Sequence, residues 1–182
     1  MCHKANNTLA FLKRNLDKCP MHVKDKCYKA FVKPILEYGA CVWDPHYKNQ
    51  IEKIEKVQKR AARFVTNNYK MTHGNSEKNL NKLKWKSLEE HRARNKVITF
   101  CKALKGETVL PVNDFKRVTV DTRQGNDKFV VPKSNINSHQ YSYFPSTLRM
   151  WNNLPQEEKD LEKIEEFKNK IKDTNLTNLK SK

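Results

Sequence analysis

Apolar residues recur every three or four positions along much of the chain, which is the spacing of one face of an α-helix. The first stripe predicts a helix near residues 5–18, ended by Pro20. A second stretch, over about 21–43, is apolar on two faces, so the sequence predicts a largely buried helix there. Pro34 lies inside this pattern and should kink or split the helix, because proline lacks the amide and clashes with the preceding turn.

A third helix is predicted over about 45–66, with an aspartate cap and a proline at its start. Asp44 has a carboxylate for the N-cap, and Pro45 suits the first helical position. The apolar stripe of this helix consists of Ile51, Ile54, Val57, Ala61 and Phe64. At roughly 100° per residue, a row of cations falls opposite that stripe. The row consists of Lys53, Lys56, Lys59, Arg60 and Arg63.

The middle of the chain predicts a loop, a short helix and a long helix. Residues 67–78 are polar and contain a glycine, which indicates a loop, and a short helix is expected over 77–84. Ser87 and Glu90 form a capping box that opens a helix to about residue 105, and Gly106 is its expected stop. The cations of this helix are expected to add positive surface: Arg92, Arg94, Lys96 and Lys102.

Beyond residue 107 the pattern changes to short alternating segments. Val118, Val120, Phe129 and Val131 predict short strands joined by a turn at 124–127. Tyr141 and Tyr143 flank another extended piece, a short helix is expected over 145–153, and a final amphipathic helix over 157–172. Phe144 and Trp151 are interpreted as core residues rather than as stacking platforms.

The expected fold is mainly α: a helical bundle followed by a small mixed α+β C-terminal region with short strands near 115–145. The expected division is a three-helix bundle over 1–66, a linker loop over 67–78, a helical region over 79–172 and a disordered tail over 173–182.

Charge changes the picture by pointing to a polyanionic partner. The 182 residues carry a formal net charge of +17 at pH 7. Residues 1–105 hold 24 basic and 9 acidic residues, whereas residues 151–182 hold 7 of each. A concentrated positive field attracts a nucleic acid or an anionic membrane. The alternative is a generally soluble basic surface.

The cations of the third helix are candidates for contacting phosphates, with Lys13 and Arg14 in support. The alternative is a solvated charged face, which many helices have. Arg123 and Arg149 are further candidates, because aromatic and basic residues interleave around them in the way that single strands are bound. Two acids, Glu52 and Glu55, lie among the cations of the third helix and leave that face strongly positive.

Signals for catalysis or a cofactor are weak. Adjacent glutamate pairs such as Glu89–Glu90 diverge on a helix and do not converge on one substrate. The five cysteines have irregular spacing, which does not match a zinc site or a disulfide framework. We therefore expect no catalytic residue, no metal and no cofactor. With no signal-peptide pattern and no long apolar run, we expect a nuclear or cytoplasmic protein that does not bind membranes.

Five stretches of sequence carry a family resemblance. They are Lys4–Asn6 with Leu9–Leu16, Tyr28 with Val32–Pro45, Ile54–Phe64, Leu83–Arg92 and Tyr141–Pro155. In this order and spacing they resemble the C-terminal part of reverse transcriptases from non-LTR retrotransposons of the LINE, jockey and CR1-like type. The resemblance implies that residues 1–66 form a polymerase thumb, which grips RNA and DNA of the template–primer, and that the remainder is the region after it.

The same resemblance sets the limits of the expected activity. The family's fingers and palm, with their aromatic-x-Asp-Asp motif, are missing from this sequence, and so is its endonuclease. Because two-metal nucleotidyl transfer needs those carboxylates, we expect this chain not to polymerise by itself. The expected function is therefore a non-catalytic, nucleic-acid-gripping fragment that works with the missing fingers and palm. Two alternatives stay open: a structural remnant without independent activity, and an enzyme fragment with an unfamiliar site.

Overall fold

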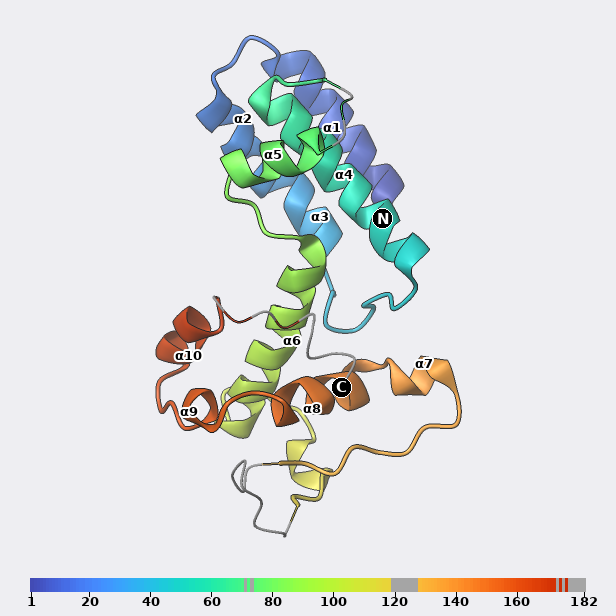
Figure 1. Ribbon diagram of the computed structural model, residues 1–182, viewed down its shortest axis with the longest axis vertical. Helices are drawn as coiled ribbons and strands as arrows, with labels where there is room; N and C mark the ends of the chain where they lie inside the picture. The colour runs from blue at the N-terminus through green and yellow to red at the C-terminus, as the bar shows by residue number, and fades with distance from the viewer. Residues whose placement is uncertain (71, 73, 119–127, 173, 175, 177–182) are drawn as a thin grey trace. The chain divides into compact units, whose positions relative to one another are not determined.

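The computed structural model describes residues 1–70, 72, 74–118, 128–172, 174 and 176 (Figure 1). The described chain is mainly α-helical, which confirms the expected class. It divides into two compact units. The first unit consists of Met1–Gly39 and Pro45–Glu89, and the second consists of Ala40–Asp44 and Glu90–Lys182.

Helices α1 to α5 form the first unit (Figure 1). Their bounds are α1 Cys2–Leu16, α2 Met21–Cys27, α3 Lys33–Glu37, α4 Lys48–Thr66 and α5 Asn75–Lys82. The core between them takes one apolar stripe from each long helix, as the periodicity predicts. Its buried members include Leu9, Leu12, Tyr28, Val32, Leu36, Val57 and Phe64.

Pro34 is accommodated by a wide turn rather than by a break. Residues Tyr28–Val32 form a π-helical turn that joins α2 to α3. The amide of Lys33 donates to the carbonyl of Tyr28, five residues back, so the extra residue makes room in front of the proline ring. The helical segment then ends at Glu37, several residues before the expected end near 43.

The predicted start of the third helix is wrong. Helix α4 begins at Lys48, and its N-cap is Tyr47, which makes no side-chain capping bond. Asp44 instead forms ion pairs with two cations of α6, which are described below. Its carboxylate is therefore not available to cap α4. The loop expected over 67–78 is also shorter than predicted, because α5 begins at Asn75.

Three asparagines join α5 to the residues that follow α4. The amide nitrogen of Asn68 donates to the side-chain oxygens of Asn75 at 2.9 Å and of Asn79 at 3.0 Å. The side-chain amide of Asn79 donates to the backbone carbonyl of Asn68 at 3.2 Å. Asn75 and Asn79 are buried. A polar composition that suggests a loop therefore forms an internal hydrogen-bond network that holds α5.

Helix α6, Leu88–Leu104, begins directly after Ser87 and stops where the sequence predicts. Gly106 has a φ of 75°, and the amide of Glu107 donates to the carbonyl of Lys102 at 2.9 Å. The amide of Gly106 donates to the carbonyl of Ala103 at 3.1 Å. These two bonds form a Schellman motif, which a residue without a Cβ adopts at no steric cost.

The second unit continues with α7 Asn137–Gln140, α8 Tyr143–Asn152, α9 Gln156–Lys159 and α10 Ile164–Lys170 (Figure 1). Its core combines aromatic and aliphatic side chains of α6, α8 and α10, among them Val97, Phe100, Leu148, Trp151 and Phe167. Trp151 is 2% exposed, which confirms its interpretation as a core residue. Phe144 is half-buried and packs on Phe115, with ring centroids 4.8 Å apart.

The extended segments predicted for this unit differ from the structure, and one predicted turn lies outside the described residues. In the described part of 115–145, β pairing is limited to one antiparallel bridge between Arg117 and Phe129. The predicted turn at 124–127, together with Val120, lies outside the described residues. The extended piece expected at Tyr141 and Tyr143 is helical from Tyr143 onward.

The expected final helix is broken into α9 and α10 at residues 160–163. The ammonium group of Lys105 donates to the carbonyls of Leu161 and Glu162 at this break. These carbonyls therefore have a partner although no following helical turn supplies one. Leu176, from the segment expected as a tail, is fully buried in the core of this unit.

Candidate nucleic-acid interface

Helix α4 has one buried face and one basic face. The buried residues are Ile54, Val57, Gln58, Ala61, Ala62, Phe64 and Val65. At roughly 100° per residue, the five predicted cations fall within about a third of the circumference on the other side. Lys53, Lys56 and Arg60 are exposed, whereas Lys59 and Arg63 are half-buried. We call these five side chains together with Lys13 the basic face.

Lys13 of α1, a candidate from the sequence, lies close enough to two cations of α4 for their charges to act on it. Burial lowers the pKa of the Lys13 ammonium group, and the nearby charges of Arg60 and Arg63 lower it further. Its nitrogen lies 5.8 Å from the centre of the Tyr69 ring, a cation–π distance. Three positive groups from two helices therefore share one area of the first unit, at a cost in mutual repulsion.

Arg60 is held in place without losing its charge. Its guanidinium donates to the side-chain oxygen of Asn6 on α1 at 3.1 Å. An amide partner orients the guanidinium but does not neutralise it, unlike a carboxylate. Asn6 was not predicted as part of the site. A signal is present in the sequence, because Asn6 and Lys13 are seven residues apart and so lie on the same face of α1.

One of the two acids of α4 is drawn away from the basic face. The Glu55 carboxylate accepts the backbone amide of Glu89, in the first turn of α6, at 2.9 Å. It satisfies one of the amides that a helix start leaves without an internal partner. Within the described residues, Lys53, Lys56 and Lys59 form no ion pair. The basic face therefore keeps most of its positive charge.

No contact among the described residues links the other predicted site residues to this face. Arg14 is exposed, one position and so roughly 100° around α1 from Lys13. Arg149 is half-buried on α8, in the second unit. Arg123 lies outside the described residues. The candidate interface in the first unit is therefore Lys13 plus the five cations of α4.

The expectation that α6 adds positive surface is wrong for three of its four cations. Arg92, Arg94 and Lys96 are 0%, 8% and 2% exposed. The Arg92 guanidinium donates to one oxygen of Asp44 at 2.8 Å, and the Lys96 ammonium lies 3.0 Å from the other. Arg94 pairs with Glu90 at 2.9 Å. These three side chains are therefore buried within the second unit and add little positive surface.

The described residues contain no cluster of three or more histidine, cysteine, aspartate or glutamate side chains that could bind a metal ion. Each described helix is too short or too polar to cross a membrane. Comparison of the chain with protein families, with curated proteins and with solved structures finds no match.

Proposed function

We propose that this chain grips template–primer nucleic acid through the basic face of α1 and α4, as a non-catalytic, thumb-like fragment of a non-LTR retrotransposon reverse transcriptase. The observation that carries the proposal is the gathering of Lys13, Arg60 and Arg63: burial lowers the pKa of the Lys13 ammonium group, and the charges of the two arginines lower it further. A protein that holds like charges together at a cost gains by binding an anion there, because the anion removes the repulsion. The family assignment rests on the sequence resemblance alone.

The basic face would act on the phosphate backbone rather than on the bases. Lysine and arginine side chains on one side of a helix can follow a row of phosphates and release the counterions bound to them. Contacts of this kind position a strand without reading its sequence. The chemistry of strand extension would come from the missing fingers and palm, so this chain would hold RNA and DNA and not cleave or extend them.

The triple variant Lys59→Gln, Arg60→Gln, Arg63→Gln tests this role directly. We expect it to weaken binding about equally for all sequences, because phosphate contacts carry no sequence information. Loss of three phosphate contacts should also flatten the slope of log K against log salt by about 2 to 3. The measurement is fluorescence anisotropy with a labelled RNA–DNA hybrid.

A matched control removes the same charge from the second unit. The variant Lys133→Gln, Lys163→Gln, Lys170→Gln replaces three exposed lysines. We expect it to keep a slope closer to that of the unchanged protein, since the loss of net charge is equal but no residue of the basic face is touched. Equal affinity and slope in the α4 variant and the unchanged protein, both shown to be folded by circular dichroism, would refute the role of the basic face.

A second candidate function is a structural remnant whose helices pack on an absent partner domain. Two exposed phenylalanines favour it: Phe11 on α1 is 56% exposed and Phe31 in the π-helical turn is 57% exposed. Large apolar side chains in water are typical of a contact surface when they form a patch. Self-association in light scattering, together with absence of nucleic-acid binding, would favour this candidate over the first.

A further inference from the structure

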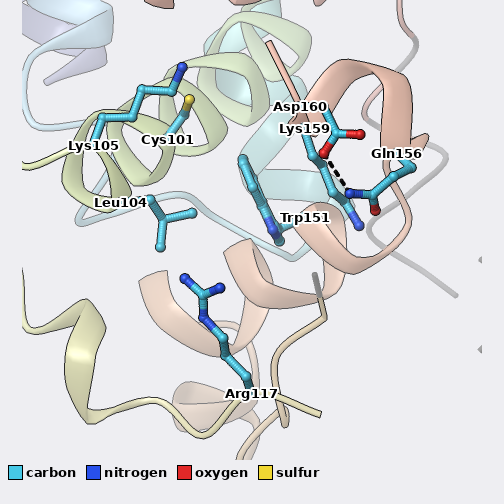
Figure 2. A pocket seen from close by; sticks show the side chains of 8 residues that line it. All are labelled: Cys101, Leu104, Lys105, Arg117, Trp151, Gln156, Lys159 and Asp160. Carbon is cyan, nitrogen blue, oxygen red and sulfur yellow. Dashed lines mark hydrogen bonds between the residues drawn. The ribbon is translucent and has the colours of Figure 1, made fainter. Parts of the chain in front are cut away.

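The second unit contains an open pocket of about 290 Å³ beside Trp151, and two of its polar lining groups are bound within the protein (Figure 2). The Lys105 ammonium group donates to the two backbone carbonyls at the break between α9 and α10. The Gln156 amide nitrogen donates to Asp160 at 2.7 Å (Figure 2). Trp151 itself belongs to the hydrophobic core of the unit. These contacts belong to the fold, whereas an aromatic ring of the first unit is presented to solvent.

That ring is Tyr69, which lies beside the basic face. It is 49% exposed and comes three residues after the end of α4. The Lys13 ammonium group lies over the ring, 5.8 Å from its centre. Burial lowers the pKa of Lys13, and the charges of Arg60 and Arg63 lower it further, which places both arginines near this ammonium group. An aromatic surface and three cations therefore share one area of the first unit.

The backbone on both sides of Tyr69 is held by hydrogen bonds. Before it, the amide of Asn68 donates to the carbonyl of Arg63 in α4 at 3.1 Å. After it, the amide of Lys70 donates to the side-chain oxygen of Asn68 at 3.4 Å. The carbonyl of Lys70 accepts the side-chain amide of Asn75 at 2.6 Å. Tyr69 is therefore presented from a segment that is tied to α4 and α5, so a ligand that contacts the ring needs to order little of the backbone.

One acid lies near this ring and limits what can bind there. Burial raises the pKa of the Tyr69 hydroxyl, and the charge of Asp17 raises it further. The hydroxyl therefore stays protonated and uncharged near pH 7. A phosphate is attracted by Lys13 and repelled by Asp17, whereas an uncharged base is repelled by neither. The surroundings of Tyr69 therefore suit a base better than a further phosphate.

We propose that Tyr69 stacks against one unpaired base of the strand whose phosphates the basic face contacts. Single strands are bound in this way, by cations that follow the backbone and by aromatic side chains on which bases stack. A base inside a duplex is stacked on both faces by its neighbours and offers no face to a protein ring. The partner is therefore a strand with at least one unpaired base, either a free single strand or an overhang next to a duplex. This inference rests on the proposed function, because it needs phosphates on the basic face.

The test compares two strands that have the same phosphates and differ in their bases. A labelled single-stranded DNA of about twelve nucleotides and a strand of equal length built from abasic units are bound to the whole chain. Fluorescence anisotropy measures both affinities. The unchanged protein should bind the normal strand about tenfold more tightly, as stacking of one base predicts. Equal affinity for the two strands would overturn the proposal, and this arm needs no variant to fold.

Two variants of Tyr69 assign the difference to its ring. Tyr69→Ala should weaken binding of the normal strand about tenfold and leave binding of the abasic strand unchanged. The slope of log K against log salt should stay the same, because no charge is removed. Tyr69→Phe keeps the ring and should bind like the unchanged protein. Tyr47→Ala is the matched control, since Tyr47 is 52% exposed and lies at the other end of α4. It should bind both strands like the unchanged protein.

A further pair of probes distinguishes the two sources of the unpaired base. A blunt RNA–DNA hybrid is compared with the same hybrid carrying a single-stranded overhang. If Tyr69 stacks on an overhang, Tyr69→Ala weakens binding of the second hybrid and not of the first. If only the free single strand responds to Tyr69→Ala, the partner is a strand without an adjacent duplex.

The outcomes separate the stacking role from the proposed function. Salt-dependent binding that Tyr69→Ala leaves unchanged for every probe would overturn the stacking role and leave the function of the basic face intact. Equal weakening of the normal and abasic strands would also overturn it, because the residue would then act on the phosphate contacts. Absence of salt-dependent binding to all of these probes would overturn both proposals.

Discussion

Asp44 shows how much one residue in a short connecting segment contributes to this structure. Its side chain is 5% exposed and its two oxygens bind Arg92 and Lys96, which are 0% and 2% exposed. The Lys96 ammonium also donates to the Ser146 hydroxyl at 3.2 Å, which links the pair to α8. Two cations on one buried carboxylate depend on it, because an unpaired charge in an apolar interior costs far more than a paired one.

Replacing this carboxylate is therefore expected to lower the stability of the protein strongly. Asp44→Ala should lower the free energy of unfolding by about 3–5 kcal/mol, since two buried cations lose their counter-charge. Asp114→Ala, at an exposed position, should change it by less than about 0.5 kcal/mol. Urea unfolding followed by circular dichroism measures both. A loss of less than about 1 kcal/mol for Asp44→Ala would contradict the buried ion pair.

Tyr28 predicts a dependence of stability on alkaline pH. The ring is 1% exposed and stacks on Trp85 with centroids 4.2 Å apart. Burial raises the pKa of its hydroxyl far above the usual value of 10.0, and the charges of Glu37, Glu55 and Asp25 add to the rise. Above pH 10 the unfolded chain loses this proton while the folded chain keeps it, so stability is complete below pH 10 and falls as pH rises.

The variant Tyr28→Phe isolates this effect, because it has no proton to lose. Between pH 10 and 11, the stability of the unchanged protein should fall relative to that of the variant by roughly 1 kcal/mol, because half of the unfolded chains have already lost this proton at pH 10. Tyr47→Phe, at a side chain that is 52% exposed, is the control and should follow the unchanged protein. Urea unfolding at pH 8, 10 and 11 provides the comparison. Parallel pH curves for the unchanged protein and the Tyr28 variant would show that this hydroxyl titrates normally.

At the scale of elements, local sequence patterns predicted where most helices lie. They did not predict which side chains of those helices form contacts with residues far away in the sequence. The stripes of α1 and α4 and the stop of α6 follow from spacing and from a glycine, both of which act within a few residues. The pairing of Asp44 with α6 joins residues 48 positions apart, and no local signal competes with the N-cap interpretation of Asp44–Pro45. The burial of Arg92 and Lys96 could have been predicted, because with Phe100 they are spaced by four residues along one face of the helix.

The glycine at the C-terminal end of α6 is expected to contribute to stability through its backbone conformation. Gly106 has a φ of 75°, and apart from its chain neighbours no heavy atom lies within 4 Å of the position a Cβ would take, so an added methyl group meets backbone strain but no clash. Gly106→Ala should therefore cost about 1 kcal/mol of stability, and Gly106→Asn should cost less because asparagine tolerates this conformation better. Urea unfolding of the two variants checks the order. An alanine variant as stable as the unchanged protein would contradict the left-handed conformation.

At the scale of the whole molecule, charge composition predicted a positive surface but not which cations form it. The row of cations on α4 follows from helical phase, and Lys13 was a candidate from the sequence. The structure adds Asn6 from α1, which orients Arg60. The rest needs tertiary contacts, since Arg92, Arg94 and Lys96 count toward the net charge of +17 yet are buried. The pocket beside Trp151 could not be predicted, because its lining comes from segments that only the fold brings together.

The measurement that tests the central claim most directly is binding of the unchanged protein to a labelled RNA–DNA hybrid, with single strands alongside, at about 50 and 200 mM salt. If the basic face grips four to six phosphates, log K should fall against log salt with a slope of roughly −3 to −5. That slope, obtained with the hybrid, is the predicted result. Absence of binding at the lower salt concentration, from protein shown to be folded, would contradict a nucleic-acid-gripping function. The cations of α4 would then be solvated surface charges without a nucleic-acid partner.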